Sequence, residues 1–209
     1  MPPSTALTVP DPVRRAELAD FAGRVVQLDP AATVRLRASA AGDTITAWAS
    51  TPFEVLAGRG VPGTLEPADV VATAAGLLTA LAVQRAARVD PGSAEPWNGG
   101  PLPPDDGWVT LDELPASEWA AMVAAGLDEA GRNGLVSEVL DRTVRTVPEP
   151  SAGRVVTVPL RCLFALSGLG WLDEPEATVR ISATRGWLRL DTSGGAVLRR
   201  RAPALPLLL

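Results

Sequence analysis

The sequence predicts an α+β protein of two similar lobes, each a short antiparallel sheet of three strands packed with helices. Alternating apolar and polar residues, typical of half-buried strands, follow helical segments in both the first and the last third of the chain. A segment rich in proline and glycine separates these thirds. The chain has 209 residues, of which 46% are apolar, and this is sufficient for a buried core.

The first unit begins with a helix whose two ends are both marked in the sequence. Asp11 is a capping carboxylate, and Pro12 suits the first helical position. Apolar residues then recur at steps of three and four until Asp29-Pro30 ends the helix. Two alternating runs follow as a hairpin, and a third strand comes after them. The expected strands are 33–39, 44–49 and 53–57.

The middle of the chain is expected to be helical on both sides of a linker. Apolar residues on one face predict a helix over 67–88. Five prolines and four glycines in 90–107 favour neither a helix nor a sheet, and Trp97 is expected to hold this linker on the surface. Beyond the linker, helices are expected from Pro115 toward residue 126 and over 135–147.

The last third repeats the order of the first. A β-branched run over 154–158 predicts a strand, and a helix from Pro159 leads into a second alternating hairpin and a third strand. We interpret 158–201 as a pseudo-repeat of the N-terminal unit. The sequence thus predicts an N-terminal lobe over 11–89, a linker over 90–107 and a C-terminal lobe over 108–209.

The composition removes most enzyme chemistry. All 19 basic residues are arginine, and histidine, lysine and tyrosine are absent. A Ser-His-Asp triad, a lysine Schiff base and a P-loop lysine therefore cannot form, and one cysteine without histidine cannot build a zinc site. We expect no catalytic residue, no metal and no cofactor. The preferred function is a non-catalytic interaction, scaffold or regulatory module; the alternative is a binder of small anionic ligands, or an enzyme that uses carboxylates and arginines.

Charge and chain layout restrict the partners. A net charge of −5 argues against nucleic acid, because affinity for phosphate backbones comes from basic side chains. The apolar run over 70–83 is too short to span a membrane. One cysteine and no signal peptide favour the cytoplasm. We expect another protein or a second copy of the chain as the partner.

Three motifs are interpreted as structural. The run from Gly58 to Gly63 has G-x-G-x-x-G spacing, but Pro62 removes an amide that a phosphate would need, so we expect a plain turn. The acidic pairs and clusters lack the spacing of a calcium loop and are expected to be solvated. They lie at 105–106, 112–113 and 173–176. Cys162 sits in an apolar helix and is expected to be an inert thiol.

The candidate interaction surface combines tryptophan and arginine. Trp48 and Trp187 lie on the second strands of their hairpins and are expected to face away from the two cores. Either helices or the other lobe bury both rings, or the rings form an exposed platform with arginines for a ligand or partner. Alternating arginines are otherwise typical of a wet sheet face. The candidate residues are Trp48, Trp187, Arg35, Arg37, Arg180, Arg189, Arg199, Arg200 and Arg201.

The chain ends with three arginines followed by the apolar segment 202–209. This segment either folds back onto the body or docks on another protein or on an anionic membrane surface. We favour folding back, because an exposed apolar end promotes aggregation.

Overall fold

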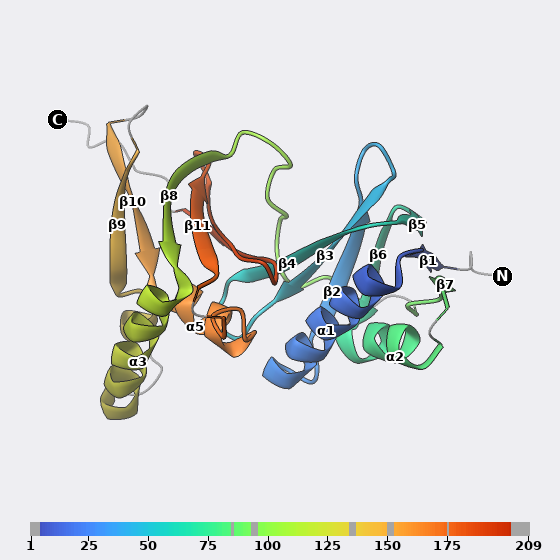
Figure 1. The fold of residues 1–209 in the computed structure, drawn as a ribbon, viewed down its shortest axis with the longest axis horizontal. Coiled ribbons are helices and arrows are strands. Elements are labelled where there is room, and N and C mark those ends of the chain that lie inside the picture. The colour runs from blue at the N-terminus through green and yellow to red at the C-terminus, as the bar shows by residue number, and fades with distance from the viewer. Residues whose placement is uncertain are drawn as a thin grey trace.

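One antiparallel sheet of eight strands runs through both halves of the molecule (Figure 1). The computed structural model describes residues 5–84, 86–92, 96–133, 137–149, 153–174 and 176–201. In sheet order the strands are β6 (Asp69–Thr73), β2 (Thr33–Ala38), β3 (Thr44–Ser50), β4 (Leu56–Pro62), β13 (Ala196–Arg200), β12 (Trp187–Asp191), β11 (Thr178–Ala183) and β8 (Val109–Pro115). At the centre β4 pairs with β13, with Ala57 opposite Val197, so the sheet passes unbroken from one domain to the other.

The helices lie on one side of this sheet (Figure 1). They are α1 (Pro12–Leu28), α2 (Ala74–Gln84), α3 (Ala116–Asn133), the short α4 (Ser137–Leu140) and α5 (Leu160–Gly168). Asp11 caps α1, because its carboxylate accepts a hydrogen bond of 2.8 Å from the Val13 amide. One hydrophobic cluster joins side chains of both domains beneath the sheet. Among the described helices, none combines the length and the apolar character that crossing a membrane requires.

Two smaller sheets flank the large one. Strand β1 (Ala6–Thr8) pairs with both β5 (Thr64–Glu66) and β7 (Arg88–Val89) in the N-terminal domain. In the C-terminal domain β9 (Thr143–Glu149) and β10 (Arg154–Pro159) form a hairpin.

The predicted fold class is confirmed. In the N-terminal domain α1 is followed by β2, β3 and β4, and in the C-terminal domain α5 is followed by β11, β12 and β13. The third strand of each unit lies at the centre of the sheet, so the two units meet through equivalent strands. The β4–β13 pairing makes the strands of both lobes parts of one sheet.

Two predicted helices are wrong in part. Within 67–88, residues Asp69–Thr73 form strand β6, and of the described residues only Ala74–Gln84 are helical. The reason is tertiary, because β6 supplies the hydrogen-bonding partner for the edge of β2 that faces away from β3. Within 135–147, α4 ends at Leu140, and Thr143–Glu149 pairs with β10 instead. The sequence also missed β8, which directly precedes α3.

The expected turn at Gly58 is likewise wrong. The third strand runs over Leu56–Pro62 rather than 53–57, so Gly58 and Gly60 lie inside β4. Gly58 stands opposite Trp48 on β3, and a Cβ at Gly58 would overlap the indole ring. The glycine therefore lets the tryptophan lie flat on the neighbouring strand.

Candidate functional site: the cleft between the domains

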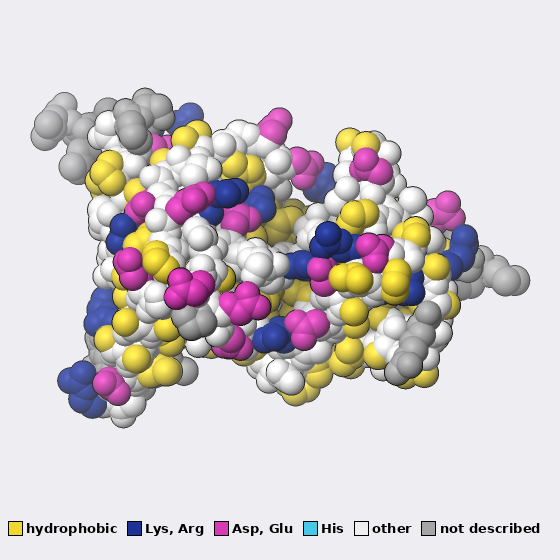
Figure 2. Space-filling model, in the orientation of Figure 1, with side chains coloured by type: hydrophobic (Ala, Val, Ile, Leu, Met, Phe, Trp, Pro, Cys, Tyr) yellow, Lys and Arg dark blue, Asp and Glu magenta, His cyan; other side chains and the backbone are white. Residues whose placement is uncertain are grey.

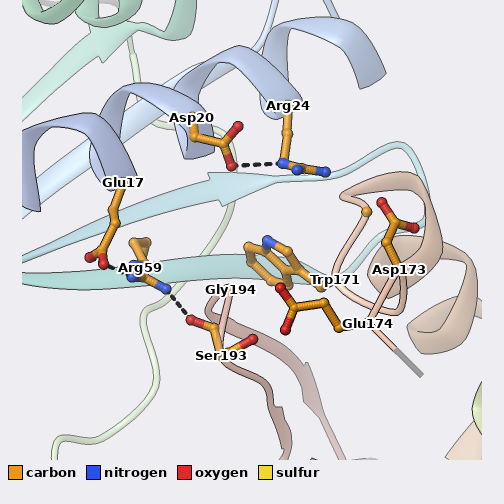
Figure 3. A pocket seen from close by; sticks show the side chains of 10 residues that line it. Glu17, Asp20, Arg24, Arg59, Trp171, Asp173, Glu174, Ser193 and Gly194 are labelled. Carbon is orange, nitrogen blue, oxygen red and sulfur yellow. Dashed lines mark hydrogen bonds and ion pairs between the residues drawn. The ribbon is translucent and has the colours of Figure 1, made fainter. Parts of the chain in front are cut away.

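A cleft of about 290 Å³ opens between α1 and two segments of the C-terminal domain (Figure 3). The N-terminal domain contributes Glu17, Asp20 and Arg24 from α1, and Arg59 from β4. The C-terminal domain contributes the segment 170–174, which follows α5, and the turn at 193–194 between β12 and β13. The cleft therefore depends on both domains keeping their relative position.

Trp171 joins the two walls of the cleft. Its ring stacks on Phe21 of α1, with ring centroids 6.2 Å apart and an interplanar angle of 18°. On its other side the indole lies against the turn of Gly194 and Gly195, where a Cβ at either position would overlap the ring. Only 6% of Trp171 is exposed, so the side chain packs between the two domains and borders the cleft.

Arg59 forms a second link across the cleft. Its guanidinium pairs with Glu17 at 2.6 Å and donates a hydrogen bond to the Ser193 carbonyl of the opposite domain. The hydrogen bond from Arg59 is the main cause that holds the pKa of Glu17 below its ordinary value, although burial opposes it. Glu17 is thus ionised at neutral pH and engaged within the protein.

Arg24 forms a third link. Its Nε donates to Asp20 at 2.7 Å, and its Nη1 donates to the Leu169 carbonyl at 2.7 Å. Because α1 carries Arg24 and the C-terminal domain carries Leu169, this side chain also fixes the width of the cleft. The hydrogen bonds of Arg24 and Arg59 thus connect the two domains in addition to the shared sheet.

Asp173 and Glu174 complete the cleft and leave it acidic. Both are exposed, and neither side chain forms a hydrogen bond or ion pair with any residue that the structure describes. Figure 3 shows the Glu174 side chain beside Trp171. The lining has four carboxylates and two guanidinium groups, and both guanidinium groups are already paired. The cleft therefore suits a cationic group next to an aromatic edge.

The two predicted tryptophans lie elsewhere, on the sheet face opposite the helices. Trp187 is 9% exposed and Trp48 is half-buried, and both belong to a second hydrophobic cluster. Within the described residues no helix contributes to this cluster, but both lobes do, with Leu56 from β4 and Leu198 from β13. The loop 96–108 also covers the rings, because its Trp97 and Trp108 pack against this cluster. The expectation that Trp97 holds the linker on the surface agrees with this contact.

The predicted arginines do not form one site. Arg35, Arg180 and Arg189 share the outer face, but each pairs with a nearby carboxylate. Five strand steps separate Arg35 on β2 from Arg180 on β11, which is about 24 Å. Arg189 also lies over the Trp108 ring, 5.4 Å from its centroid. Arg37 is exposed on β2.

The three arginines near the C-terminus have different surroundings, because successive residues of a strand point to opposite faces of the sheet. Arg199 points to the helical side and pairs with Asp141 at 2.7 Å. Arg200 is exposed, and Arg201 pairs with Glu149 at 3.1 Å. The apolar segment 202–209, for which folding back was expected, lies outside the described residues.

Few other described side chains could act as a nucleophile or a metal ligand. Cys162 is completely buried in α5, and burial raises the pKa of its thiol to about 12. Within the described part of the chain, no three acidic or sulfur side chains gather as a metal site would require. The acidic run at 173–176 stands out in the sequence, but the cleft does not, because its other residues come from distant segments.

Comparisons with known proteins address the fold. Residues 2–99 match the model of a domain of unknown function (DUF8010), and residues 103–204 match that of a second one (DUF8185). No curated protein matches this chain. Among solved structures, a DNA polymerase sliding clamp from Pseudomonas aeruginosa superposes with a TM-score of 0.57 at 13% identity. The fold is similar to that of a sliding clamp.

Further clamps extend this likeness. The clamp from Bacillus subtilis gives a TM-score of 0.58 at 12% identity, and each of these two comparisons covers 97% of this chain but 66% of the clamp. The DNA polymerase III β subunit of Caulobacter crescentus gives 0.54 at 16% identity, covering 93% of this chain and 64% of that one. The chain thus spans about two thirds of the length of these clamps, and the likeness concerns the fold.

Proposed function

We propose that this chain is a non-catalytic scaffold that binds a partner protein at the cleft between its two domains. The observation that carries this proposal is the construction of the cleft. Both domains line it, a shared sheet and two arginines fix its width, and its outer carboxylates remain available. A preorganised surface of this kind loses little conformational entropy when a partner binds.

The chemical state of the side chains supports binding over catalysis. A general acid or base at neutral pH needs a pKa near 7. The pKa of Glu17 is lowered by Arg59, and that of Cys162 is raised far above neutrality by burial. Neither group is therefore suited to proton transfer or nucleophilic attack at pH 7.

The balance of charge favours a partner with a basic segment. Asp173 and Glu174 can accept hydrogen bonds from an arginine or lysine side chain of the partner, and Trp171 borders the same space. The net charge of −5 and the acidic cleft oppose a nucleic-acid partner. The similar solved structures are named as sliding clamps and as a polymerase subunit, and a scaffold role agrees with these names. A cytoplasmic location is part of this proposal.

The test compares two charge-matched double variants. Asp173→Asn with Glu174→Gln neutralises the cleft, whereas Asp105→Asn with Asp106→Asn removes the same charge from the loop on the opposite sheet face. Partners captured from the native cell on the wild-type chain are purified, and their affinities for all three proteins are measured. We expect roughly tenfold weaker binding to the cleft variant only, the loss of about one charge-assisted hydrogen bond.

Two outcomes would contradict the proposal. Equal affinities for the three proteins would remove the cleft from the interface. Turnover of a substrate by the wild-type chain, abolished when one cleft carboxylate is neutralised, would make the protein an enzyme.

A further inference from the structure

A second hollow, at the C-terminal end of β13, is strongly basic. Its volume is about 350 Å³, and it lies between the β9–β10 hairpin and the ends of β12 and β13. Five arginines line it, whereas Asp141 is the one carboxylate among the described lining residues. This concentration is unusual in a chain with a net charge of −5 and 19 arginines in all. The five are Arg154, Arg185, Arg199, Arg200 and Arg201.

Two of these arginines are engaged within the protein. Arg199 pairs with Asp141 at 2.7 Å, and Arg201 pairs with Glu149 at 3.1 Å and donates to the Thr184 carbonyl at 2.6 Å. These contacts hold two guanidinium groups in place at the inner side of the hollow. In both ion pairs the partner of the arginine is a carboxylate.

The other three arginines have no such partner. Arg154 begins β10, Arg185 lies in the β11–β12 turn, and Arg200 ends β13. All three are exposed, and none of their guanidinium groups forms an ion pair or hydrogen bond with a residue in the described ranges. They come from separate segments yet line one hollow, so their charges reinforce one another there.

The hollow is also partly apolar. Its lining includes Leu188, which is buried, Pro159, and Val155, which is 56% exposed. A ligand in this position can therefore bury an apolar side chain while its charges meet the arginines. A simple inorganic anion would leave the exposed Val155 uncovered.

We propose that this basic hollow is a second docking site, and that its ligand is an acidic peptide segment of another protein. Carboxylates of the segment pair with Arg154, Arg185 and Arg200, and an apolar side chain of the same segment covers Val155. This inference is independent of the cleft, because the two sites share no residue and attract opposite charges.

Fluorescence anisotropy tests the site with a labelled peptide of alternating glutamate and leucine, and with a lysine-leucine peptide as the charge control. The variant Arg154→Gln with Arg185→Gln removes two unpaired arginines. The matched control, Arg37→Gln with Arg88→Gln, removes two exposed arginines from the N-terminal domain. Because all four side chains are exposed, circular dichroism is expected to report unchanged folding of both variants.

We expect the acidic peptide to bind the wild-type chain and the control variant equally, and the site variant at least about tenfold more weakly. The lysine-leucine peptide should not bind to the hollow. No binding of the acidic peptide, or an equal loss in both variants, would overturn the proposal. A ten-nucleotide thymidine strand that displaces the peptide and depends on the same arginines would do so too, since the hollow would then be a nucleic-acid site.

Discussion

Phe21 and Trp171 stack across the boundary between the two domains, with their ring centroids 6.2 Å apart. Phe21 belongs to α1 and is 1% exposed, and Trp171 follows α5 and is 6% exposed. The contact lies directly beside the cleft and next to the turn of Gly194 and Gly195. The same pair of rings therefore stabilises the fold and sets the shape of the proposed binding surface.

Trp171→Ala should lower the free energy of unfolding by about 3–5 kcal/mol, the usual cost of truncating a buried aromatic side chain. Trp171→Phe should cost clearly less, because it keeps a ring against Phe21. Urea denaturation followed by circular dichroism measures both. If Trp171→Ala unfolds within about 0.5 kcal/mol of the wild type, the range of neutral surface changes, the Trp171 side chain is not important for stability.

Gly58 and Gly60 offer a matched pair on one strand. Gly58→Ala should destabilise the protein by about 1–3 kcal/mol, because the new Cβ would overlap the Trp48 ring and force it to move. At Gly60 the nearest atom to a new Cβ is the Thr46 hydroxyl, 3.9 Å away, so Gly60→Ala should be nearly neutral. The melting temperatures of the two variants, measured by thermal unfolding, test this prediction. Equal melting temperatures would show that Trp48 does not restrict position 58.

Asp141 should contribute to the pH dependence of stability. Burial tends to raise the pKa of its carboxyl, but hydrogen bonds from Arg161 and Arg199 outweigh burial, so the pKa lies below the ordinary 3.8. The unfolded chain thus binds this proton more readily than the folded one. The stability that the ionised Asp141 carboxylate contributes is complete above about pH 4, and it is lost as the pH falls through the lower pKa of the folded state.

Urea midpoints measured between pH 7 and pH 3 test this prediction. Asp141→Asn should be less stable than the wild type at pH 7, and its stability should fall less steeply in acid. Asp106→Asn, an exposed loop change, should keep the wild-type slope. The prediction is wrong if Asp141→Asn and the wild type lose stability in parallel down to pH 3.

Cys162 should resist alkylation while the protein is folded. Its thiol is buried, and a pKa of about 12 leaves roughly one thiolate in ten thousand at pH 8. Iodoacetamide at pH 8 should modify it only at the rate of unfolding, and rapidly in guanidinium chloride. Mass spectrometry over time distinguishes the two states. Complete modification of the native protein within minutes would mean that α5 opens readily.

Local signals allowed part of the fold to be predicted. The start of α1 follows from Asp11 and Pro12, and the hairpins of both units follow from strict alternation within short segments. Interactions between neighbours in sequence decide these elements. The domain limits at 11–89, 90–107 and 108–209 stay a prediction.

Elements that depend on distant partners could not be predicted. Asp69–Thr73 precedes a long apolar run and shares its spacing, but the open edge of β2 makes it a strand. Thr143–Glu149 is a strand because β10 lies beside it. The spacing at Gly58 resembled a turn, and only the opposite Trp48 explains the glycine.

The candidate cleft was hidden for the same reason. Arg59 lies inside a strand and its partners lie at positions 17 and 193, so no local pattern connects them. The tryptophans that did stand out, Trp48 and Trp187, are packed against a loop of the same chain. These two tryptophans, although conspicuous in the sequence, therefore serve the packing of the fold.

Site-specific photo-cross-linking tests the central claim most directly. A benzophenone amino acid replaces Glu174 at the cleft in one protein and Val83, which is 74% exposed on α2, in another. After irradiation in the native cell, we predict a discrete cross-linked product with a partner protein from position 174 and none from position 83. No product from position 174, or the same products from both positions, would contradict a scaffold that acts through the cleft.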